Sequence, residues 1–177
     1  MERFVNHVTT EGVPIFKIEE TYNKIRLAAR LIAAQTLAED VIVVSSRDLG
    51  QRAVIKFAHY TGCMATSDAR WTPGVLTNHM TKQFKEPRLM VVVDTYADRK
   101  AIIEASYMNI PVIALTNSDS NLQYVDVAIP CNNKSTQSIS MIFWLLAREV
   151  KILNGTLRKG IHFFWQENVL FEIFAPA

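Results

Sequence analysis

The chain has 177 residues, a mass of 20.1 kDa and a formal net charge of +2, with 49% apolar and 20% charged residues. This length and composition are typical of one globular domain with a sizeable core, and they exclude a disordered protein. The net charge is too small to indicate nucleic acid binding by itself, and the mild excess of basic residues lies within positions 1–90.

The first half of the chain predicts three strands and two helices. A short strand is expected over 12–17, a continuous apolar strand over 41–46 and a third over 63–67. The first helix should follow from Glu19, because apolar residues recur at helical spacing. A second helix should begin with Asp48 as its cap and end at Thr61-Gly62. The apolar positions of the first helix are Ile18, Tyr22, Ile25, Ala29 and Ile32.

In the second half of the chain, predicted strands and helices alternate more regularly. Strands are predicted over 88–94, 111–115 and 124–130, with a helix over 97–108 between the first two. A long helix should run from about Ser135 to Leu153, with Gly155 as its stop signal. Such alternation predicts a doubly wound α/β domain, with a mostly parallel, five-stranded sheet flanked by helices. We assign residues 1–160 to this single domain and 161–177 to an apolar tail.

Polar residues follow the predicted strands at Ser45-Ser46, Thr66-Ser67, Asp94-Thr95, Thr116-Asn117 and Cys131–Asn133. Ligands in doubly wound folds bind at this edge, so a domain that binds a sugar phosphate or nucleotide is one interpretation. The other is that helix starts need such residues as caps, which would explain each of them. A glycine-rich dinucleotide fingerprint and a phosphate-binding P-loop are both missing from the sequence, which disfavours a nucleotide site.

The stretch 128–140 joins the last strand to the last helix and carries two reactive side chains. Cys131 would be a nucleophile if a helix N-terminus lowered its pKa and a base lay nearby, but a buried free cysteine is the commoner case. Lys134 either binds a phosphate at the helix start or is a solvated loop residue, and the sequence leaves both open.

Basic and aromatic residues give further candidates for contacts. Arg47, Arg52 and Lys56 surround one helix start, where they either meet RNA phosphates or form a solvated face. In the loop 69–78, Arg70 and Trp71 combine a guanidinium with a large stacking surface. The tail must be buried against this domain or a partner, since it concentrates apolar residues that include Phe163, Phe164, Trp165, Leu170, Phe171 and Phe174.

Several classes of site are disfavoured. Cys63 and Cys131 lie 68 positions apart, so they form no CxxC pair, and the four histidines lack ligand spacing. This pattern fits a reducing compartment. No window reaches the roughly 18 apolar residues of a membrane span, and the first residues lack the apolar core of a signal peptide. We therefore expect a soluble, intracellular protein without membrane contact or a metal site.

Four ordered motifs, over roughly residues 15–165, resemble the universal small-subunit ribosomal protein of the S-two family. They are SSRDLGQRAVIKFA, RWTPGVLTN, the segment from EPRLMVVVD to IPCNNK, and FWLLAREV. IPCNNK and YVDVAIP are similar to the archaeal and eukaryotic branch, whose members are also called SA, S-zero or laminin-receptor-like. The resemblance implies a flavodoxin-like domain without a coiled-coil insertion.

The resemblance also implies a non-enzymatic structural role in the cytoplasmic small ribosomal subunit and in its assembly, which in a eukaryote would begin in the nucleus. Small-subunit ribosomal RNA and neighbouring ribosomal proteins would be the partners, and a small-molecule substrate, a cofactor and catalytic residues are not expected. The expected RNA or protein contacts are Arg47, Arg52, Lys56, Arg70, Trp71, Asn78, Arg99, Lys100, Asn132, Asn133 and Lys134. The tail is the expected docking segment for a neighbour.

This sequence departs from the family pattern at several points. The family's DPRAD is replaced by Asp94-Thr95-Tyr96-Ala97-Asp98, and the glycine after IPCNNK is replaced by Ser135. The longer N-terminal segment and the acidic C-terminal extension of many relatives are absent from the sequence, so a divergent or reduced lineage is expected. The apolar segment 141–146 is better explained as core, so a laminin-receptor role is not transferred.

Overall fold

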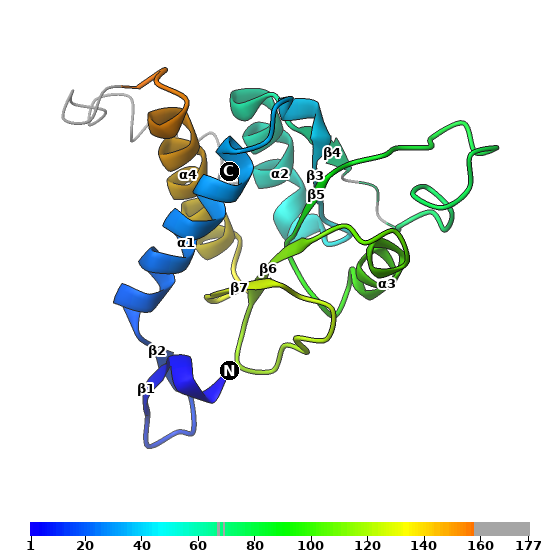
Figure 1. Cartoon of the computed structure of the whole chain (residues 1–177). Coiled ribbons are helices and arrows are strands. Elements are labelled where there is room, and N and C mark those ends of the chain that lie inside the picture. Colours follow the sequence, from blue (N-terminus) through cyan, green and yellow to red (C-terminus); the bar gives the residue numbers. More distant parts are fainter. Residues whose placement is uncertain (67, 69, 158–177) are drawn as a thin grey trace.

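A computed structural model describes residues 1–66, 68 and 70–157 (Figure 1). The α-helices are α1 (Ile18–Ala33), α2 (Asp48–Thr61), α3 (Arg99–Tyr107) and α4 (Thr136–Leu153). Short 3-10 turns are η1 (Glu2–Phe4) and η2 (Ala38–Asp40). The strands are β1 (Val5–Val8), β2 (Pro14–Phe16), β3 (Val41–Val44), β4 (Met64–Thr66), β5 (Leu89–Val92), β6 (Val112–Thr116) and β7 (Val127–Pro130).

Strands β3 to β7 form one parallel sheet of five strands in the order β4-β3-β5-β6-β7. All residues of β3, β5 and β6 are buried, as expected for strands covered on both faces. The chain passes from β3 outward to β4 and then returns to β5 on the other side of β3. The switch point therefore lies between β3 and β5, and the predicted doubly wound α/β fold is confirmed.

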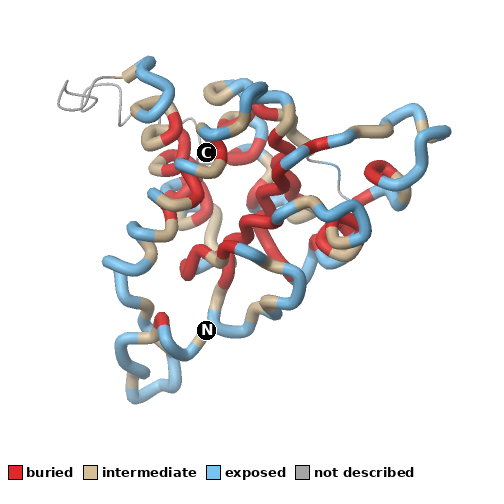
Figure 2. The backbone as a smooth tube through the Cα atoms, in the orientation of Figure 1, coloured by how far each residue is buried: buried red, intermediate tan, exposed pale blue. Residues whose placement is uncertain are grey.

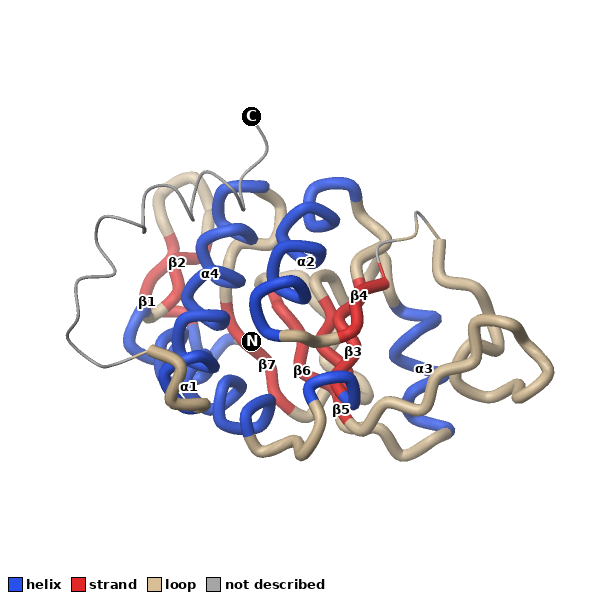
Figure 3. Tube along the Cα trace, turned by 90° about the horizontal axis from the view of Figure 1, so that it is seen from above, coloured by secondary structure: helices blue, strands red, loops and turns tan. Residues whose placement is uncertain are grey.

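The two faces of the sheet are covered differently. Helices α1, α2 and α4 pack on one face around Phe57 and Phe143, whose rings meet edge to face at 5.4 Å. The other face is covered by α3 and by the segment 70–87, which contributes Trp71, Val75 and Leu76. Figure 2 shows the buried residues concentrated in the sheet and on the inward sides of the helices. Figure 3, seen from above, shows α3 and the adjoining loops on the side away from α1 and α4.

The predicted strand at 12–17 exists, but it does not join the main sheet. It is β2, and it pairs antiparallel with β1, an element that we did not predict. This hairpin turns at Gly12, whose φ of 82° suits glycine. It extends from the body beyond the start of α1 (Figure 1), and Phe4, the last residue of η1 just before it, is buried.

Two details of the predicted helices also differ. The apolar stripe of α1 begins with Ile18 and Tyr22, which are 83% and 40% exposed, so only its later turns pack on the sheet. Asp48 is the first residue of α2 and not its cap, because Arg47 occupies the N-cap position without a side-chain capping bond.

The proposed tail, 161–177, lies outside the described residues, and so do Phe163 to Phe174 among its candidates. Within the described ranges, we find no helix that is both long and apolar enough to cross a membrane.

Candidate functional site at the carboxyl edge of the sheet

The carboxyl ends of the strands meet in a network of side chains around Asp94. Arg47 Nη1 donates to Asp94 Oδ2 at 2.8 Å, and the Asp94 side chain is only 6% exposed. The other carboxylate oxygen accepts the backbone N–H of Tyr96 at 3.0 Å and Asn133 Nδ2 at 3.4 Å. One carboxylate thus joins the segments that follow β3, β5 and β7.

A second carboxylate, Asp98, lies at the same switch point and is fully buried. Its Oδ1 accepts the backbone N–H of Ser46 at 2.9 Å, whereas Oδ2 has no hydrogen-bond partner within the described ranges. Burial raises the pKa of Asp98 despite the bonds from Ser46, and the nearby charge of Asp94 acts in the same direction. These two carboxylates tie β3 to the start of α3 across the crevice where doubly wound domains bind ligands.

The prediction that the polar residues at the strand ends cap the following helices is wrong. None of the N-cap residues of α1 to α4, all of which lie in the described part, makes a side-chain capping bond. Asp98 is the N-cap of α3, yet its carboxylate bonds to Ser46 after another strand. Thr116 and Asn133 also bond across strands, because the parallel sheet brings its carboxyl ends together. The side chains that bond within their own turns instead are those of Ser45, Asn117 and Asn132.

Cys131 is 5% exposed, and burial raises the pKa of its thiol to about 12. The side chain is therefore protonated at neutral pH and is no nucleophile. Burial raises the pKa of Cys63 as well. Both cysteines act as small apolar core residues.

Lys134 is placed by the turn that precedes α4. The backbone N–H of Lys134 bonds to Asn132 Oδ1 at 2.9 Å, and its Nζ pairs with Asp119 Oδ2 at 2.9 Å. The bond from Lys134 is the main cause that lowers the pKa of Asp119. Both side chains are at least half exposed, so the pair leaves Lys134 accessible with its charge largely compensated.

Trp71 is not on the surface. It is 3% exposed, and its Nε1 donates to Glu104 Oε2 at 2.7 Å. Glu104 Oε1 accepts the backbone N–H of Leu76 at 2.9 Å and both the N–H and the hydroxyl of Thr77 at 3.2 Å. In this conformation the indole anchors the segment 70–87 and offers no stacking face to a partner. Asn133, 1% exposed, is an internal residue too.

The remaining predicted contacts are accessible to different degrees. Asn132, Arg52, Arg70 and Asn78 are exposed, whereas Lys56 is half-buried. The side chain of Asn78 accepts the backbone N–H of Met80 at 3.0 Å. Arg99 and Lys100 are exposed in the first turn of α3. The carboxyl edge therefore brings together Arg47, Arg99, Lys100 and Lys134, while Arg70 lies in a separate segment.

Sequence reasoning missed Glu104 and Asp98, which together with Asp94 are buried carboxylates that organise this side of the molecule. Glu104 stands in the predicted helix 97–108 three residues after Ala101, a position on the buried face of α3. That spacing is the only signal that would have shown it. Across the described positions, we find no group of three or more His, Cys, Asp or Glu residues placed to hold a metal.

The comparisons with known proteins all indicate the same family. Residues 79–152 match the family described as Ribosomal protein S2. The chain is 52% identical over 161 residues to the small ribosomal subunit protein uS2 of Urechis caupo, an alignment that covers 91% of this chain and 50% of the relative. It is 58% identical over 154 residues to the protein of that name from Candida tropicalis, covering 87% and 59%. The chain thus spans half to three-fifths of the length of these relatives.

Proposed function

This chain is a relative of the ribosomal protein S2 family, and from that premise we propose that it is a structural, non-enzymatic constituent of the cytoplasmic small ribosomal subunit. It would support the assembly and stability of that subunit through contacts with ribosomal RNA and neighbouring ribosomal proteins. The observation that carries the proposal is the identity of 52% to 58% to proteins named small ribosomal subunit protein uS2.

The geometry of the switch point supports a scaffold over a small-molecule domain. The crevice between β3 and β5 is bridged by the bond between Arg47 and Asp94 and by that between Ser46 and Asp98. A sugar phosphate or nucleotide at that point would have to break both bonds. We therefore keep ligand binding at the crevice only as the rival that an experiment should test.

Basic residues that are at least partly exposed are the proposed phosphate contacts. Charged side chains that meet phosphates position a protein on RNA without reading its sequence. The proposed set is Arg47, Arg52, Lys56, Arg70, Arg99, Lys100 and Lys134. With a net charge of only +2, contacts with neighbouring proteins should supply much of the attachment. The tail, 161–177, is the proposed docking segment for such a neighbour.

Sedimentation tests this function directly. A tagged chain expressed in a eukaryotic cell should co-sediment with small subunits in a sucrose gradient at low salt. Deletion of residues 163–177 should leave a folded domain but reduce the fraction in the subunit peak. The proposal fails if the full chain stays with free protein. Ligand binding at the crevice would be supported instead if calorimetry shows saturable binding of a sugar phosphate or nucleotide that Ser45→Ala abolishes.

A further inference from the structure

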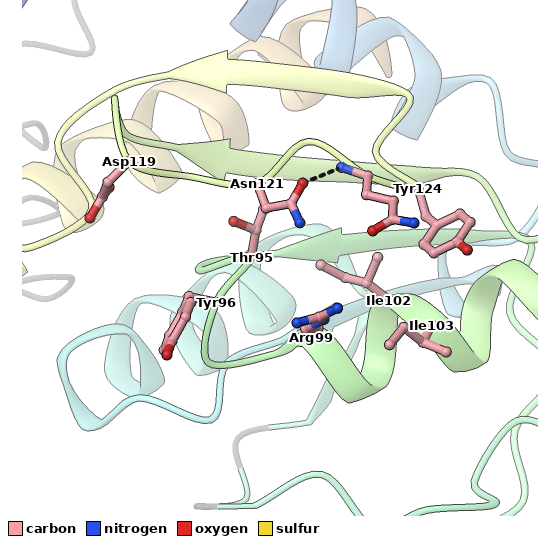
Figure 4. A pocket seen from close by; sticks show the side chains of 9 residues that line it. Thr95, Tyr96, Arg99, Ile102, Ile103, Asp119, Asn121 and Tyr124 are labelled. Carbon is pink, nitrogen blue, oxygen red and sulfur yellow. Dashed lines mark hydrogen bonds between the residues drawn. The ribbon is translucent and has the colours of Figure 1, made fainter.

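A pocket opens beside the network just described, in a groove between α3 and the connection from β6 to β7. That connection, residues 117–126, contains no helix, although a crossover between parallel strands usually does. A ten-residue segment without a helix therefore connects the two strands. The side of α3 that a crossover helix would cover stays open. The result is a pocket of about 220 Å³ lined by Thr95, Tyr96, Arg99, Ile102, Ile103, Asp119, Asn121, Gln123 and Tyr124 (Figure 4).

The pocket combines aromatic, cationic and amide side chains. Figure 4 shows Tyr96 and Tyr124 toward opposite ends with Arg99 between them. Tyr96 is 86% exposed and Tyr124 is 52% exposed, so both rings are available to a ligand. Asn121 and Gln123 line the opposite wall, where the backbone N–H of Gln123 donates to Asn121 Oδ1 at 3.0 Å. Ile102 and Ile103 supply an apolar floor from α3.

Thr95 gives an independent sign that a polar ligand fits this pocket. The residue lines the pocket, is 3% exposed, and its hydroxyl finds no hydrogen-bond partner in the described part of the protein. A buried hydroxyl without a partner costs free energy that a bound polar group would recover. It lies four residues before Arg99, close to the start of α3, where backbone N–H groups favour an anion.

The charges favour an anionic ligand with a planar ring. Asp119 is the acidic residue of the lining, and its charge is compensated by Lys134 at 2.9 Å. Arg99 is thus the charged lining residue for which the described part of the structure shows no opposite charge in contact. Lys100, the next residue in the sequence, adds a second cation. Aromatic rings stack on nucleobases of any sequence, and amide side chains bond to base edges.

We propose that this pocket holds one unpaired nucleotide of an RNA strand. Its base stacks on Tyr124 or Tyr96 and bonds to Asn121 or Gln123, while its phosphate meets Arg99 and the start of α3. The Thr95 hydroxyl bonds to the sugar or the phosphate. This inference deepens the proposed function, on which the identity of the RNA as ribosomal rests. It adds a site for a flipped-out nucleotide to contacts that otherwise only position phosphates.

The test uses the full chain and a fluorescein-labelled, single-stranded RNA hexamer, with affinity measured by anisotropy. Tyr124→Asn removes the ring, and asparagine tolerates the left-handed backbone at this position, where φ is 63°. We expect this variant to weaken binding by about 5- to 150-fold, the range that corresponds to the loss of one stacking residue. Arg99→Gln should weaken binding too, because it removes the phosphate contact. The same hexamer in a duplex should bind more weakly than the single strand.

Tyr107→Asn and Arg30→Gln are the matched controls, because both residues are exposed and neither lines the pocket. The proposal is overturned if the pocket variants bind as wild type does, or if the controls lose as much affinity. Photocrosslinking from position 124 in assembled subunits should yield RNA adducts, and adducts to a protein alone would overturn it too. If the chain binds the hexamer through the pocket but does not sediment with small subunits, the pocket stands and the proposed function fails.

Discussion

Glu104 shows how one side chain can take the place of a secondary-structure element. The segment 70–87 covers one face of the sheet without a helix, so its backbone donors need partners. Glu104 accepts bonds from Trp71, Leu76 and Thr77 and so fixes the segment to α3. Burial acts to raise the pKa of Glu104, but these bonds outweigh it, and the net effect lowers the pKa.

Replacing Glu104 should release this segment. Glu104→Ala leaves several buried donors without an acceptor, and we expect a loss of about 3 kcal/mol in the free energy of unfolding. Glu104→Gln keeps one carbonyl for Leu76 but turns an amide toward the Trp71 N–H, so it should cost less. Urea denaturation at pH 7 measures both, with Glu86→Ala, exposed in the same segment, as the control. Equal stability of the Ala variant and wild type would contradict this role.

Asp98, unlike Glu104, should destabilise the folded protein when its carboxylate is charged. Its pKa is raised, so the folded state binds a proton more readily than the unfolded state, and keeping the carboxylate charged costs stability above that pKa. Asp98→Asn preserves the acceptor for Ser46 and removes the charge. We expect it to raise the free energy of unfolding at pH 7.

The gain from Asp98→Asn should fade as the pH falls toward the pKa of Asp98, because wild-type Asp98 then becomes neutral as well. Thermal unfolding from pH 7 down to pH 4 measures this trend, and Asp68→Asn, at an exposed position, provides the control. A variant that is less stable than wild type at every pH would show that the charge itself is required.

At the scale of elements, the buried strands were the most predictable feature. Continuous apolar runs at 41–44, 89–92 and 112–116 admit few alternatives, because only a strand covered on both faces buries every residue. The hairpin formed by β1 and β2 and the helix-free covering by 70–87 were not predictable. The covering segment is held by Glu104, a tertiary partner that no local pattern reveals. The same holds for the carboxyl edge, where propensity predicted caps and tertiary contacts formed a network.

The packing of α2 on the sheet depends on a glycine in its first turn. A Cβ at Gly50 would lie 2.7 Å from Ser45 Oγ and 2.9 Å from Val93 Cγ1. Gly50→Ala should therefore destabilise the domain by about 1–2 kcal/mol, although alanine favours helices. Chemical denaturation checks this against Gly12→Asn, where a Cβ meets open space and asparagine tolerates the positive φ. If the Gly50→Ala variant were as stable as wild type, α2 would be able to move away from the sheet without a cost in free energy.

At the scale of the whole molecule, three features fit the proposed role as a scaffold. The crevice at the switch point is bridged by side chains, the thiol of Cys131 is buried, and Arg99, Lys100 and Lys134 are accessible at the carboxyl edge. The family and its fold were predictable because several motifs occur in order along the chain. Which basic residues share one edge was not, since Arg47, Arg99 and Lys134 are brought together only by the topology of the sheet.

This distribution of charge predicts how RNA binding responds to salt. If Lys100 and Lys134 each neutralise one phosphate, the double variant Lys100→Gln/Lys134→Gln should lower the slope of log K against log salt by about 1.4 for single-stranded RNA. Filter binding of a labelled single-stranded RNA between 50 and 200 mM salt, a range in which such slopes are resolved, measures it. Arg30→Gln/Arg88→Gln removes the same charge from the opposite end of the domain, where Arg88 pairs with Asp40 at 3.4 Å. Equal slopes for the two double variants would mean that RNA senses only the net charge and that the carboxyl edge is no contact surface.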